Sequence, residues 1–215
     1  MPGKDDRAIL ARLREEYFDL LPGIRRVTSH LEAEIRYHTL PIFHSLVHYE
    51  QLIVKSRVKD CESAIKSLRL DQEGGTFDPD RPEAYSILHL NDLAGVRALV
   101  FPGTKLNETD SLLRGRFQNW TPKPVIDIDG KQLASKYFGY CTDETGSLVG
   151  QVKAEYQVVP MLLGLFWEVE HSAIYKPTPR LRGITRSLEM QKCTNDVHRA
   201  LRAFEEEFES LIQGE

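Results

Sequence analysis

Two kinds of hydrophobic periodicity, one at the ends of the chain and one in its middle, constrain the fold most strongly. At the N-terminal end, apolar residues recur at helix spacing from residue 5 to about residue 38, and Pro22-Gly23 predicts a break within this stretch. At the C-terminal end, an apolar stripe over residues 197–211 predicts a helix that begins with a cap at Thr194 or Asn195. We therefore expect helices at both ends of the chain.

Between these ends, short strand-like runs alternate with helical stretches. The strand-like runs cover residues 96–101, 122–130 and 152–159, and the helical stretches cover residues 40–70, 108–119 and 161–175. Residues 71–83 have the composition of a loop. This order predicts an α+β fold in which helices flank a mixed β-sheet of four or five strands.

Composition excludes several classes of protein. The 215 residues suffice for one compact domain, and 41% hydrophobic content with a net charge of −4 excludes a disordered tail and a general polyanion binder. The sequence has no run of about 18 apolar residues that would predict a membrane span, and its N-terminus does not look like a secretory signal. Three well-separated cysteines favour reduced thiols and a cytoplasmic location.

A cationic segment begins at residue 57. Arg57, Lys59, Ser63 and Lys66 combine positive charge with a hydroxyl, which suits a polyphosphate. On the helix predicted over residues 40–70, Lys59, Ser63 and Lys66 would share one face. A solvated helix face is the alternative for this segment.

Polar residues also accompany two of the strand-like runs. Asp92 lies at the mouth of the run 96–101, where a carboxylate can hold a divalent metal or simply cap the strand, and Arg97 follows within reach of a phosphate or a base. Glu155 and Gln157 would point to the same face of a strand, where a charge and an amide need partners or a ligand. The sequence thus predicts polar groups within the sheet.

Taken in order, these segments resemble the synthetase domain of RelA/SpoT-type alarmone synthetases, in particular its small members. The resemblance covers residues 40–177 and depends on the ordered set of motifs. The matching positions are Arg57, Lys59 and Ser63; Asp92 to Arg97; Gly139-Tyr140; Glu155 and Gln157; and Trp167, Glu170, His171, Tyr175 and Lys176.

This resemblance implies a nucleotidyltransferase-like sheet and transfer of pyrophosphate from ATP to the 3′-hydroxyl of a purine nucleotide, without hydrolase activity. It implies Asp92 and Glu155 as catalytic residues and as ligands of Mg²⁺. The implied ATP-binding residues are Arg57, Lys59, Ser63, Lys66 and Arg97, and the implied acceptor-binding residues are Tyr140, Gln157, His171 and Lys176. A helical segment at 1–39 would precede the core at 40–177, and a basic loop and helix at 178–215 would follow it.

Two positions depart from the family pattern. Ser67 stands where many members carry a lysine, and Glu144 stands where members often carry a histidine. Because a carboxylate at residue 144 would repel phosphates, a catalytically degenerate nucleotide-binding homologue is one alternative.

The sequence does not identify the molecule that accepts the pyrophosphate group. GDP, GTP or an adenosine nucleotide would fit stacking on a tyrosine, while some small relatives act as toxins that modify the 3′-CCA end of tRNA. Arg180, Arg182 and Arg186 could follow an RNA backbone, or they form a solvated basic loop. An antitoxin protein and a homo-oligomer are also compatible with the resemblance.

Overall fold

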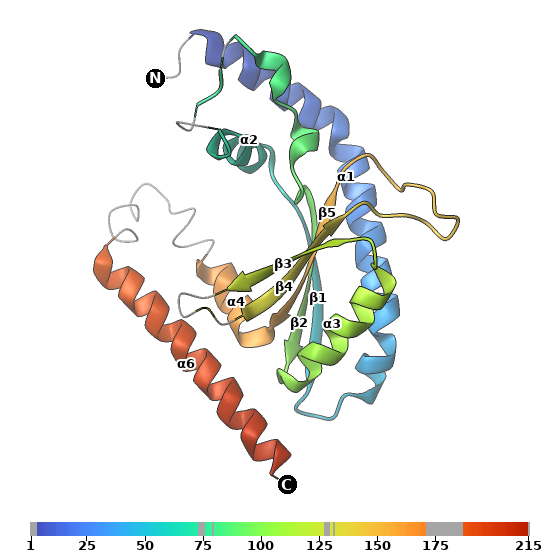
Figure 1. The fold of residues 1–215 in the computed structure, drawn as a ribbon, viewed down its shortest axis with the longest axis vertical. Helices are drawn as coiled ribbons and strands as arrows, with labels where there is room; N and C mark the ends of the chain where they lie inside the picture. Colours follow the sequence, from blue (N-terminus) through green and yellow to red (C-terminus); the bar gives the residue numbers. More distant parts are fainter. Residues whose placement is uncertain are drawn as a thin grey trace.

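A five-stranded sheet lies at the centre of the computed structural model, which describes residues 4–72, 76–78, 80–126, 130, 132–170 and 187–214 (Figure 1). The strands are β1 (Gln51–Val58), β2 (Ala94–Phe101), β3 (Thr121–Ile126), β4 (Gln132–Gly139) and β5 (Ala154–Pro160), in the spatial order β1-β2-β5-β4-β3. β2 and β5 are parallel, and the other neighbouring pairs are antiparallel. The predicted α+β class with a mixed sheet is therefore confirmed.

The long helix α1 (Lys4–Ser45) runs along one face of the sheet (Figure 1). The predicted break at Pro22-Gly23 is wrong, because α1 continues through the proline. Buried apolar residues keep helix spacing on both sides of it, and their burial outweighs the roughly 3 kcal/mol that an interior proline costs. These buried residues are Ile9, Leu13, Tyr17, Ile24, Val27, Leu31 and Ile35.

The segment before the first motif is a strand, so the prediction of a helix over residues 40–70 is wrong for residues 51–58. Leu52 and Val54 are buried while Gln51 and Ile53 are exposed, which is the alternation of a strand. A short apolar run is ambiguous between helix and strand by periodicity alone. Pairing along the whole length of β2 decides the outcome, and the helix α2 (Cys61–Leu70) starts only after β1.

The remaining helices follow the predictions more closely. They are α3 (Thr104–Arg116), α4 (Met161–Glu170) and α6 (Leu188–Gln213), with the short 3₁₀ helices η2 (Pro82–Ala84) and η3 (Ile87–His89) before β2. α6 begins earlier than predicted, because Ser187 rather than Thr194 or Asn195 caps it: the Ser187 side chain accepts from Met190 N at 3.1 Å.

The two faces of the sheet differ in their cover. α1 and α3 cover one face, where Val96, Ala98, Tyr156 and Val158 join the main core. α4 packs on the opposite face, which we call the site face, and its Met161 joins a smaller buried cluster with residues of β2, β4 and β5. Among the described residues, no helix is both long and apolar enough to cross a membrane.

Candidate functional site

Three neighbouring strands align Arg57, Gly95 and Glu155 in one row on the site face. In the register of the sheet, Arg57 of β1 faces Gly95 of β2, and Gly95 faces Glu155 of β5. The Arg57 side chain lies across Gly95, since a Cβ atom at residue 95 would be 3.3 Å from both Cγ and Nε of Arg57. Nη2 of Arg57 thereby comes within 4.0 Å of Glu155 Oε1 on the far side of β2.

Asp92 lies at the same end of the sheet, just before β2. Its Oδ2 is 3.9 Å from Arg57 Nη2, and Lys59 donates to both of its carboxylate oxygens at 2.7 and 2.9 Å. The backbone of Lys59 is also fixed by hydrogen bonds: its N–H donates to Leu93 O at 2.9 Å, and its carbonyl accepts from the Tyr17 hydroxyl at 2.8 Å. Two carboxylates and two cations therefore converge at one end of the site face.

Glu155 is fixed by a chain of polar contacts, and its side chain is 6% exposed. Gln157 donates through Nε2 to Glu155 Oε1 and accepts through Oε1 from Arg97 Nε at 3.0 Å. Arg97 also contacts the Gly164 carbonyl at 3.5 Å and lies over the Trp167 ring, and burial lowers the pKa of its guanidinium. The prediction that Glu155 and Gln157 share a face is confirmed.

The predicted ATP-binding residues are not all brought together. Lys59 lies before α2, so the prediction that Lys59, Ser63 and Lys66 share one helix face is wrong. Ser63 lies in the first turn of α2, where its N–H bonds to the capping Asp60 side chain at 2.9 Å, and Lys66 is exposed one turn later. Because β1 extends to Val58 and α2 begins only at Cys61, Lys59 does not belong to the helix that carries Ser63 and Lys66.

Several predicted residues lie outside the described part of the chain. They are the acceptor-binding His171 and Lys176, with Tyr175 between them in the motif, and the proposed RNA contacts Arg180, Arg182 and Arg186.

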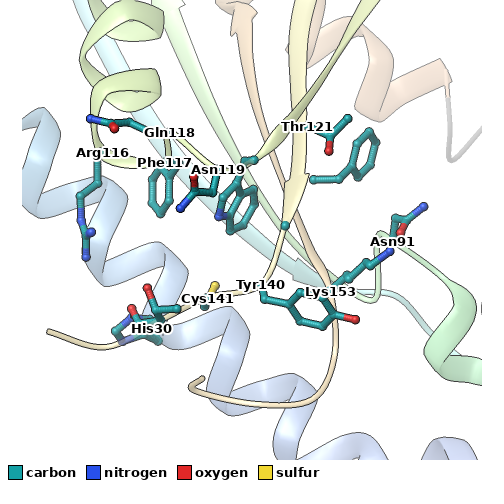
Figure 2. Close-up of a pocket in the computed structure, with 14 residues that line it drawn as sticks. His30, Asn91, Arg116, Phe117, Gln118, Asn119, Thr121, Tyr140, Cys141 and Lys153 are labelled. Atoms are coloured by element: carbon teal, nitrogen blue, oxygen red, sulfur yellow. The ribbon is translucent and has the colours of Figure 1, made fainter. Parts of the chain in front are cut away.

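A cavity of about 630 Å³ lies beside Tyr140 at the end of β4 (Figure 2). Tyr140 is 43% exposed, and Lys153 Nζ lies 5.8 Å from its ring centre. In the view of Figure 2, Asn91 lies on the same side as these two, while His30 and Arg116 lie on the other. Aromatic, basic and amide groups around one cavity suit a planar base with anionic substituents.

Glu144 is not among the residues that line this cavity. It is exposed in the turn after Thr142, which Asp143 holds by accepting from the N–H groups of Thr145 and Ser147 at 2.9 and 3.0 Å. The repulsion of phosphates expected from this substitution is weakened, because the carboxylate faces solvent.

A second row of polar residues crosses the site face, and three of its members, Lys55, Lys136 and Lys123, were missed in the sequence. The register aligns Lys55, Arg97, Gln157, Lys136 and Lys123 across all five strands. Lys55 donates to Glu168 of α4 at 2.8 Å, whereas no acid in the described part of the chain pairs with Lys123 or Lys136. These lysines lie directly opposite each other, which is unfavourable without an anion. Recognising the pair needs β4, for which no strand was predicted.

The oxygen donors of Asp92 and Glu155 fit Mg²⁺. Among the described residues, no cluster of three or more His, Cys, Asp or Glu side chains could hold a metal ion by itself. Mg²⁺ usually takes one or two carboxylates together with substrate phosphates and water, so a pair is a suitable donor set. The Asp92 oxygens already bind a cationic group in the Lys59 ammonium.

No family model and no curated protein matches the chain, but solved structures match its fold. Small alarmone synthetase 1 from Bacillus subtilis aligns with a TM-score of 0.65 at 17% identity, over 94% of this chain and 100% of that chain. The chain has the small alarmone synthetase fold. A GTP pyrophosphokinase family protein from Streptococcus pneumoniae shares this fold, with a TM-score of 0.66 at 18% identity, over 91% of this chain and 92% of that chain.

The Bacillus subtilis synthetase has also been solved with ligands. The structure with AMPCPP aligns with a TM-score of 0.63 at 17% identity, over 93% of this chain and 97% of that chain. The structure with its product pppGpp aligns with a TM-score of 0.62 at 17% identity, over 93% and 99%. At this identity the matches show the small alarmone synthetase fold, and the chemistry depends on the site residues.

Proposed function

We propose that this chain transfers a pyrophosphate group from ATP to the 3′-hydroxyl of a purine nucleotide. The observation that carries this proposal is the convergence of Asp92 and Glu155 on the Arg57 guanidinium, at 3.9 and 4.0 Å, with Lys59 bound to Asp92. The shared fold supports it, since neighbours with this fold are named alarmone synthetase and GTP pyrophosphokinase, and one binds AMPCPP, an ATP analogue, and pppGpp.

The reaction needs alignment and charge neutralisation more than covalent catalysis. The acceptor 3′-oxygen bonds to the β-phosphorus of ATP, and the bond from that phosphorus to the bridging oxygen of the α-phosphate breaks. AMP leaves with the electron pair, and the hydroxyl proton passes to a base. Glu155 is suited to polarise this hydroxyl and accept its proton, because Gln157 holds the carboxylate in place. Arg57 and Lys59 are suited to neutralise the phosphates.

Asp92 and Glu155 would hold Mg²⁺ on the ATP phosphates. When bound, the ion neutralises phosphate charge and orients the β-phosphate. The protein's own part is to keep both carboxylates at the same end of the site face, where Arg57 contacts each of them.

The order of the strands suggests how the two nucleotides divide the site face. Arg57 and Lys59 lie at β1, so ATP is proposed to lie over β1 and β2. The acceptor then lies over β4 and β3, with its base stacked on Tyr140 at the cavity and its phosphates near Lys136 and Lys123. His171 and Lys176 remain proposed acceptor ligands, and Ser63 and Lys66 remain proposed ATP ligands. For Arg97 and Gln157 we propose support of Glu155 instead.

The test compares Asp92→Asn and Glu155→Gln with a matched control, Glu108→Gln. Glu108 is an exposed acid on α3, on the opposite side of the sheet, and it pairs with Lys105 at 3.3 Å. Loss of either site carboxylate is expected to lower turnover at least 100-fold while far-UV circular dichroism stays close to that of wild type. Near-normal turnover in both site variants would remove the proposed active site.

The tRNA alternative is tested in the same reaction with bulk tRNA as acceptor. Labelling of tRNA that disappears when Arg180, Arg182 and Arg186 are replaced by alanine, together with no product from any mononucleotide, would replace the mononucleotide acceptor. Product from a mononucleotide that survives the triple change supports the present proposal.

A further inference from the structure

We propose that Gly95 is a positioning residue, whose missing side chain allows Arg57 to reach Glu155 across β2. Gly95 lies inside a strand whose residues are mostly buried, where glycine is conformationally unfavourable and packs poorly. The backbone does not require it, because the positive φ angles among the described residues occur at Gly130 and Gly146. We therefore attribute the glycine to the space that its missing side chain leaves on the site face.

That space is filled by Arg57. Neighbouring strands are about 4.8 Å apart, so a side chain on β1 must span about 10 Å to meet one on β5. The Arg57 side chain does so by lying on the Gly95 backbone, where a Cβ atom would be 3.3 Å from both its Cγ and its Nε. Both contacts are tighter than ordinary carbon and nitrogen contacts, so even alanine would push Arg57 off this path.

A small displacement matters here because the contacts of Arg57 with the carboxylates are already long. Its Nη2 lies 3.9 Å from Asp92 and 4.0 Å from Glu155, at the outer limit of an ion pair. Because attraction between charges falls with distance, a guanidinium lifted away from the Gly95 backbone holds the two carboxylates less well. Gly95 thereby determines where the positive charge of Arg57 lies relative to the two carboxylates. This role rests on the proposed function of the site.

The effect can be separated from a merely structural one, because it acts through a single side chain. The three heavy atoms outside the neighbouring residues that lie nearest the added Cβ all belong to Arg57: Cγ and Nε at 3.3 Å and the carbonyl oxygen at 3.8 Å. In a background in which Arg57 is alanine, Gly95→Ala has nothing to displace. The two positions should therefore be strongly coupled in a double-mutant cycle.

The experiment measures AMPCPP affinity and pyrophosphate transfer for wild type, Gly95→Ala, Arg57→Ala and the double variant. Gly23→Ala in α1 is the matched control, because a Cβ there meets nothing within 4 Å. We expect Gly95→Ala to weaken AMPCPP binding and lower kcat/KM by about tenfold to a hundredfold, a part of what removal of a phosphate-contacting arginine causes. In the Arg57→Ala background the same change should alter both quantities less than about twofold.

Equal losses from Gly95→Ala in both backgrounds would overturn this role, as would wild-type affinity and turnover in Gly95→Ala. If wild type makes no transfer product, the proposed function fails, while the cycle on AMPCPP affinity still decides the role of Gly95. Thermal unfolding of all four proteins detects misfolding, and the double variant, which lacks the close contact with the Arg57 side chain, should fold even if Gly95→Ala is unstable.

Discussion

Removal of one buried charge on α6 should change the pH dependence of stability. Glu205 is 8% exposed, accepts a hydrogen bond from the N–H of Leu162 in α4, and has no partner for Oε1 in the described part of the chain. Burial raises the pKa of its carboxyl to about 7, and the neighbouring Glu209 acts in the same direction. The folded protein therefore keeps this proton at a higher pH than the unfolded chain does.

The sign and the size follow from proton linkage. Between pH 4.5, the ordinary value of this carboxyl, and pH 7, the folded state binds more protons than the unfolded state, so stability falls as the pH rises. The full interval corresponds to roughly 3 kcal/mol at about 1.4 kcal/mol per pH unit. The effective dielectric constant around a buried charge in a protein is higher than that of a dry interior, which reduces this penalty to about 1–2 kcal/mol.

Glu205→Gln keeps an acceptor for Leu162 and removes the charge. We expect the variant to be more stable than wild type by about 1–2 kcal/mol at pH 8 and nearly equal to it at pH 5. Urea unfolding at both pH values measures this difference, and Glu207→Gln, at an exposed position on the same helix, is the control. A stability difference between Glu205→Gln and wild type that is the same at pH 5 and pH 8 would refute the reasoning.

Two further substitutions test the packing around the site. Gly139→Ala should destabilise the fold by about 1–3 kcal/mol, because a Cβ there would be 2.6 Å from the Trp120 indole; an unchanged unfolding temperature would contradict this packing. Lys59→Met should destabilise by about 1–3 kcal/mol, because the Lys59 side chain is 14% exposed and Asp92 would lose its ammonium partner. Equal stability of Lys59→Met and wild type in urea would show that this pair contributes no net stability.

The elements that could be predicted from the sequence are those with one strong local signal. The run over residues 96–101 is apolar and stops at Pro102-Gly103, and it forms β2. The stripe on α6 and the alternation around Glu155 were equally visible. These signals depend on neighbours within a few residues, which a sequence shows directly.

The parts that failed depend on contacts made far along the chain. β1 is a strand because it pairs with β2, and α1 passes through Pro22 because its buried stripe packs against the rest of the fold. β4 carries too little periodicity to be recognised, so the Lys123–Lys136 pair could not be foreseen. Asp92, Glu155 and Arg57 could be named as candidate site residues from their motifs, but their distances follow from the order of the strands. The role of Gly95 likewise requires the register of three strands.

Pyrophosphate transfer is tested most directly by following two labels of ATP in parallel. Wild-type protein is incubated with Mg²⁺, with GDP or GTP as acceptor, and with ATP labelled at either the α- or the γ-phosphate. Our account predicts that the γ-label appears in the acceptor product while the α-label appears in AMP, in equal amounts. It also predicts that Asp92→Asn abolishes both. Transfer of the α-label to the acceptor, or release of the γ-label as inorganic phosphate without an acceptor product, would contradict pyrophosphate transfer at this site.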